Sequence, residues 1–244
     1  MAWRRVFHPR RLRWRCLAIQ WGRPSGGGWK TTFTLVNTGA SAATARLNFL
    51  DNNGVAVSLP VSLPQTAVSG QSYSKFEQTL AAGATLIVDT EGPASLAPIG
   101  GSVQLQSDGN VTGSAVFLLS AGHQEAVVPL ESRGGKSYVL AYDNTNGYFN
   151  GIAVANTSDQ AASVVVTVRD AVTGAVKGSA HTITLPAKGH QSFLLNDATL
   201  GFPETVNTSG TLEFSTATAG QVSVLGLRFN SNDAFTSVPA LLKQ

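Results

Sequence analysis

Apolar and polar residues alternate in short runs along most of the chain. In the run "ATARLNFL" (43–50), Ala45, Leu47 and Phe49 are separated by single polar side chains. A period of two over this length predicts a β-strand with one buried face. Such runs are separated by turn-forming stretches like "DNNG" (51–54). Almost no helical periodicity is present, so we expect an all-β protein.

One long pattern occurs twice. "LVNTGASAATARLNFLDNNG" (35–54) is answered 119 residues later by "VANTSDQAASVVVTVRDAVTG" (154–174). In the second copy the alternation is carried by valines at the same spacing. The aligned pairs include Asn37 and Asn156, Thr38 and Thr157, Ala42 and Ala161, and Asp51 and Asp170.

Later segments match in the same order over about 100 residues. The matched segments are "LAAGATLIV" (80–88) with "LPAKGHQSFLL" (185–195), "GSVQLQS" (101–107) with "GTLEFST" (210–216), and "VVPL" (127–130) with "SVPAL" (237–241). We infer an internal duplication. It predicts two tandem antiparallel β-sandwich domains, Ig-like or fibronectin-III-like, each with seven or eight short strands.

The repeat also sets the expected boundaries. A basic leader would cover 1–26, the first sandwich 27–131, a polar linker 132–137 and the second sandwich 138–244. The second sandwich then begins with "YVLAYDN" (138–144), whose counterpart lies near "LAIQWGR" (17–23). If the leader is not native, the first sandwich lacks its first strand and has an unpaired edge.

The leader differs in composition from everything after it. The net charge is +3, yet residues 1–30 carry eight Lys or Arg and no acid, so residues 31–244 carry −5. All four tryptophans also lie in the first thirty residues. Three interpretations remain open: an arm for nucleic acid or anionic lipid, a degenerate twin-arginine signal, or a segment that is not native structure. We favour the third and expect 1–26 to be disordered or non-native, with no nucleic-acid binding by the folded body.

The sequence limits two further possibilities, a membrane-spanning helix and an intrachain disulfide. No apolar run approaches the roughly 18 residues needed to cross a bilayer as a helix. Cys16 is the one cysteine, which rules out an intrachain disulfide without fixing the compartment.

Several segments carry a family resemblance. "GGGWKTTFTLVNTG" (26–39), "EAVVPL" (125–130), "LPAKGHQSFLL" (185–195) and "VLGLRF" (224–229) resemble repeated β-sandwich modules at the C-terminal ends of large, uncharacterised secreted bacterial proteins. The resemblance implies an extracellular, Ig-like module of a kind often appended to other domains, and it offers no catalytic residues to transfer to this chain. It also implies a secreted or cell-surface location, although no native signal is visible in this chain.

Catalytic motifs are missing from the sequence. There is no HExxH, no clustered Cys/His spacing and no G-x-S-x-G, and the fourteen acids are scattered, mostly at turns. His123 and Glu125 could face one side of a strand as a metal site, but we favour a loop that leads into the last strand of the first sandwich. We therefore expect a non-enzymatic spacer, adhesion module or scaffold, whose partners are other domains or surface proteins.

Two kinds of binding residue stand out. Trp29, Tyr148 and Phe149 follow glycine-containing turns and could form a platform for polysaccharide, the alternative function; the competing interpretation is an aromatic plug at one end of a sandwich. No cofactor is expected. Asp51, Asp143 and Asp233 lie in oxygen-rich loops that could hold calcium, although such residues more commonly shape turns.

Overall fold

The structure, a computed structural model, describes residues 29–66, 68–90, 100–119, 124–232 and 234–243. In these ranges the chain forms eighteen β-strands and one 3-10 turn, η1 (Pro203–Thr205). The all-β prediction is confirmed. No helix among the described residues has the length and apolar character needed to span a membrane.

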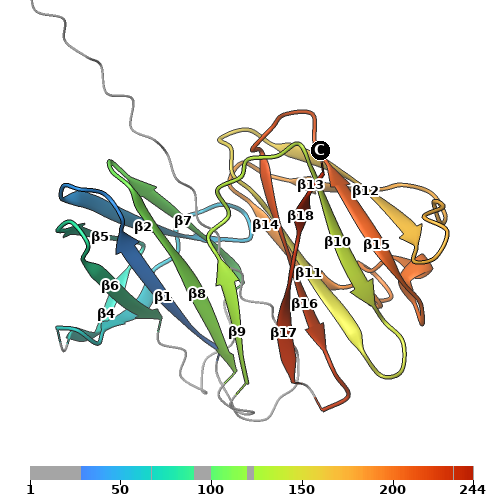
Figure 1. Cartoon of the computed structure of the whole chain (residues 1–244), viewed down its shortest axis with the longest axis horizontal. Helices are drawn as coiled ribbons and strands as arrows, with labels where there is room; N and C mark the ends of the chain where they lie inside the picture. Colours follow the sequence, from blue (N-terminus) through green and yellow to red (C-terminus); the bar gives the residue numbers. More distant parts are fainter. Residues whose placement is uncertain (1–28, 67, 91–99, 120–123, 233, 244) are drawn as a thin grey trace, which may run out of the picture.

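Residues 29–129, here the N-terminal half, form two antiparallel sheets (Figure 1). Sheet A has the order β4 (Val68–Tyr73), β3 (Leu59–Leu63), β6 (Thr85–Thr90), β1 (Trp29–Asn37), β8 (Val111–Leu119) and β9 (Gln124–Pro129). Sheet B has the order β5 (Lys75–Leu80), β2 (Ala43–Asp51) and β7 (Gly101–Ser107).

Residues 137–242, the C-terminal half, form two more antiparallel sheets. Sheet C has the order β13 (His181–Leu185), β12 (Ala162–Asp170), β15 (Ser209–Ser215), β10 (Ser137–Asp143) and β18 (Leu241–Leu242). Sheet D has the order β14 (His190–Leu194), β11 (Phe149–Asn156), β16 (Val222–Phe229) and β17 (Phe235–Pro239).

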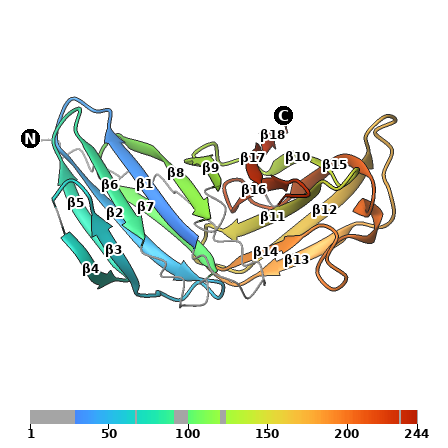
Figure 2. The ribbon, with the colours of Figure 1, turned by 90° about the horizontal axis from the view of Figure 1, so that it is seen from below.

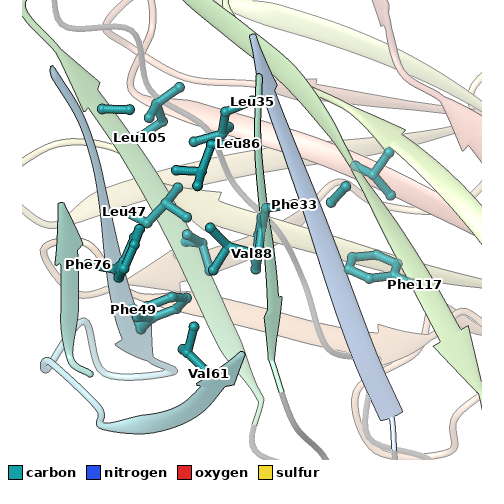
Figure 3. Packing of buried hydrophobic residues seen from close by; sticks show 14 of the residues in the cluster. Phe33, Leu35, Leu47, Phe49, Val61, Phe76, Leu86, Val88, Leu105 and Phe117 are labelled. Atoms are coloured by element: carbon teal, nitrogen blue, oxygen red, sulfur yellow. The ribbon is translucent and has the colours of Figure 1, made fainter. Parts of the chain in front are cut away.

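The alternating runs form the cores, as the sequence predicted. Ala45, Leu47 and Phe49 on β2 are each exposed by 1% or less. Leu47 and Phe49 point from sheet B toward sheet A (Figure 3). There Phe49 meets Phe33 of β1 edge to face, with ring centroids 6.2 Å apart. Val164, Val166 and Val168 of β12 are likewise buried, in the core between sheets C and D. Burial of one face of each strand is the main force that holds the sheets together.

The two central strands of sheet D, β11 and β16, are buried on both faces, which sequence reasoning did not predict. Ile152 and Val154 of β11 belong to the core shared with sheet C. Their neighbours Ala153 and Ala155 point the other way and belong to the core of the N-terminal half. The two halves lie side by side and share this apolar contact (Figure 2). They therefore form one packed body.

Strand pairing recurs between the halves. In sheet B, β2 lies between β5 and β7, and in sheet C β12 lies in the same way between β13 and β15. In sheet A, β1 lies between β6 and β8, and in sheet D β11 lies in the same way between β14 and β16. Within the described residues each half has nine strands, more than the expected seven or eight. One of the nine in the C-terminal half is β18, which has only two residues.

Candidate interaction site around Tyr148 and Arg228

Three side chains from neighbouring elements form a stack at one end of sheets C and D. The guanidinium carbon of Arg228 lies 3.6 Å from the ring centroid of Tyr148, close enough for a strong cation–π contact. Arg228 Nη2 also donates to Asp143 Oδ2 at 3.0 Å. The stack is at the surface, since Tyr148 is 36% exposed. Sequence reasoning singled out the tyrosine and the aspartate separately and missed the arginine that joins them.

The backbone turn before β11 fixes this arrangement. Asp143 Oδ1 accepts hydrogen bonds from the Thr145 hydroxyl at 2.6 Å and the Thr145 amide at 3.1 Å. Asn146 and Gly147 then take positive φ values of 52° and 81°, which reverses the chain toward Tyr148. The Thr145 hydroxyl, followed by Arg228, lowers the pKa of Asp143 below its ordinary value. The carboxylate therefore stays charged and keeps the guanidinium over the ring.

The other two predicted platform residues lie in a different environment. Trp29 contacts Phe235 of β17 with ring centroids 5.2 Å apart. Phe149 stacks on Phe229 at 5.1 Å, and Phe229 in turn contacts Phe235 at 5.7 Å. Trp29 and Phe149 are partly buried against the core to which Phe229 and Phe235 belong, so these rings connect β1 of the N-terminal half to sheet D.

Asp51 and Asp143, two of the predicted calcium residues, each serve a turn of their own. Asp51 Oδ1 accepts from the amides of Asn53 and Val55 at 2.9 and 2.8 Å, which shapes the β2–β3 turn. Asp143 is engaged as described above, and Asp233 lies outside the described residues. Within the described ranges no three or more His, Cys, Asp or Glu side chains gather as a metal site. His123 is also outside the described residues, and calcium binding stays a prediction.

The Asn-Thr pair that occurs in both halves has an asparagine that fixes turns. Asn37 is fully buried, and its Nδ2 lies 2.8 Å from Ser41 O and 3.0 Å from Leu80 O. Asn156, also fully buried, does the same at 2.6 Å from Gln160 O and 2.7 Å from Pro186 O. Each amide ties the turn after its own strand to a turn of the facing sheet. The repeated motif thus has a structural role in both halves.

A polar contact joins the halves far from the aromatic rings. His190, at the start of β14, is 3% exposed, and its Nδ1 lies 2.8 Å from Oδ1 of Asn52. The backbone amide of His190 donates to the Asn52 carbonyl at 2.9 Å. Asn52 and His190 both lie in glycine-containing turns, 51–54 and 186–190, which the sequence shows. No local pattern indicates that these two turns lie close together.

Comparison with known proteins adds little. No protein-family model matches the chain, and no curated protein matches it. Among solved structures, an anti-sigma factor domain-containing protein aligns over 86% of this chain and 82% of its own, at 9% identity and a TM-score of 0.18. A TM-score this low carries no argument about fold or function.

Proposed function

We propose that the chain is a non-catalytic β-sandwich module of the bacterial exterior, acting as a spacer, adhesion module or protein-interaction scaffold. The observation that carries this proposal is sheet D, whose two buried faces join the halves into one body. A joint buried in this way resists bending, which suits a spacer or scaffold.

The same proposal includes a common origin of the two halves. Its support is the recurrent strand pairing and the matched roles of Asn37 and Asn156. The polar residues that both halves keep are used in turns. Among the described residues, the polar side chains that both halves keep form no repeated cluster. This favours a structural module over a duplicated catalytic one.

The extracellular part of the proposal can be tested on intact cells of the source organism. Brief protease treatment of living cells should remove the protein while a cytoplasmic marker stays intact. A protein that is degraded only after lysis would contradict a secreted or surface location. Its activity as a scaffold could then still be tested by capture of a co-expressed neighbouring domain.

Carbohydrate binding is the second candidate, and the exposed Tyr148–Arg228 stack favours it. A tyrosine ring offers an apolar face to a sugar, and a guanidinium offers donors to its hydroxyls. Isothermal titration with soluble polysaccharides tests it: binding should be lost in Tyr148→Ala and kept in Val172→Ala, a variant of a 92% exposed apolar residue. Absence of heat with every glycan would exclude this candidate for the glycans tested.

A further inference from the structure

Strand β7 has a hydrogen-bonding partner along one side only, among the described residues. It pairs with β2, and sheet B ends there. In the C-terminal half the matching strand, β15, pairs with β12 on one side and with β10 on the other. The two sheets thus differ by one strand at the same position. An edge of this kind is a template for a further strand.

Strands β7 and β15 correspond in their cross-strand pairing and in the position of a glycine that lies close to the neighbouring strand. Leu105 lies opposite Leu47, as Phe214 lies opposite Val166. A Cβ at Gly101 would meet the carbonyl oxygen of the neighbouring strand at 2.0 Å. A Cβ at Gly210 would meet its neighbouring strand's carbonyl oxygen at the same 2.0 Å. The two strands therefore occupy equivalent places.

Strand β10 shows which side chains a strand at the corresponding position beside β7 would need. Its residues Tyr138, Leu140 and Tyr142 are at most 4% exposed and lie opposite Phe214, Leu212 and Gly210. The ring of Tyr142 lies over Gly210, 3.1 Å from the place of a Cβ. A strand beside β7 should accordingly carry large apolar residues at alternate positions, with an aromatic ring opposite Gly101.

We propose that the segment 17–22 of this chain, which lies outside the described residues, binds the β7 edge as an antiparallel strand. Its sequence "LAIQWG" alternates as required. Transfer of the β10–β15 register places Leu17 opposite Leu105, Ile19 opposite Val103 and Trp21 opposite Gly101. The aromatic residue thus falls on the glycine, as Tyr142 does in the other half.

Polar atoms on the other face of β7 support this register. Ser102 Oγ and Gln104 Nε2 have no hydrogen-bond partner among the described residues, although the side chains are only 2% and 5% exposed. Unpartnered buried polar atoms are costly and call for a donor or acceptor nearby. Gln20 would lie directly opposite Ser102 and diagonal to Gln104, within reach of both.

The segment between the proposed strand and β1 is long enough to form a turn. Six residues, 23–28, separate Gly22 from the start of β1 at Trp29, and five residues, 144–148, separate β10 from β11. The six are "RPSGGG", a composition that favours a turn. A strand at 17–22 can therefore feed directly into β1. This inference is independent of the proposed extracellular function.

A disulfide between the native Cys16 and a new cysteine tests the register in the full chain. The proposal places Cys16 opposite Gln106, as Ser137 lies opposite Ser215. Directly opposed residues approach closely enough for disulfide formation under mild oxidation. Gln106→Cys should therefore form an intrachain disulfide, whereas Gln104→Cys, two residues out of register, should form little. The double variant Ser137→Cys/Ser215→Cys, made in a Cys16→Ser background, is the positive control.

The outcomes are distinct. An intrachain link in Gln106→Cys supports the proposal. No link while the positive control does link overturns it, and links formed only between chains overturn it in favour of strand exchange with a second copy. Urea unfolding gives an independent measurement: Ile19→Arg should lower the midpoint, whereas Leu12→Arg should leave it unchanged. Equal midpoints for Ile19→Arg and the wild type would also overturn the proposal.

Discussion

His190 and Asn52 lie 138 residues apart in the sequence and are joined by two hydrogen bonds, one between side chains at 2.8 Å and one between backbone groups at 2.9 Å. The pair holds the β2–β3 turn of the N-terminal half against the turn that opens β14 of sheet D. With the aromatic cluster, it fixes the contact between the halves at a second place.

Gly54, at the end of the same turn, provides the sharpest test of this contact. It has a φ of 80°, and a Cβ there would lie 2.1 Å from the Ala187 carbonyl oxygen. Gly83 has a φ of 72° with nothing within 4 Å of the Cβ place, so it is a matched control. We expect Gly83→Ala to lower the free energy of unfolding by about 1 kcal/mol and Gly54→Ala by roughly 3 kcal/mol. Equal losses in urea titrations would mean that the turn does not pack against sheet D.

The shared core predicts cooperative unfolding of both halves. Because sheet D contributes to both cores, neither half can unfold without exposing apolar surface of the other. Differential scanning calorimetry should show a single transition whose calorimetric and van't Hoff enthalpies agree. Two separated transitions would show that the contact between the halves adds little stability.

Asn37→Ala should be strongly destabilising although the change is small. The side-chain amide of Asn37 serves the carbonyls of Ser41, Leu80 and Ala81, and its removal leaves them without this donor. We expect a loss of about 2–4 kcal/mol in the free energy of unfolding. Asn53→Ala, at an exposed position of the β2–β3 turn, should change it by less than about 0.5 kcal/mol. Similar values for the two variants would remove the structural explanation of the repeated motif.

Glu213 should make part of the stability depend on pH. The Lys243 ammonium at 2.5 Å, together with Arg169 at 3.1 Å, lowers the pKa of Glu213 below its ordinary value of 4.5. A lowered folded-state pKa contributes stability above pH 4.5, and this contribution is lost as the pH falls through the folded-state value. Glu213→Gln should therefore be less stable than the wild type at pH 7, by about 0.5–1 kcal/mol. The stabilities of the two proteins should converge as the pH falls from 4.5 through the lowered folded-state pKa of Glu213. A constant difference in urea titrations across this range would contradict the assignment.

Local patterns predicted the strands well, because burial of one face imposes the period of two that Ala45, Leu47 and Phe49 show. They predicted the contact between the halves poorly. A signal was present in β11, where "IAVA" (152–155) is apolar without alternation, as expected of a strand buried on both faces. The Tyr148 stack was missed for another reason: Arg228 reaches the ring through strand pairing across eighty residues, which no local pattern encodes.

The two buried faces of sheet D also limit which parts of this protein could be transferred to another protein by recombination. Residues 137–244 moved alone into another protein by recombination would expose Ala153, Ala155 and Leu227 to water. Residues 29–129 alone would lose the cover over part of sheet A. The contact between the halves therefore makes the pair the smallest piece that can be exchanged without exposing apolar surface.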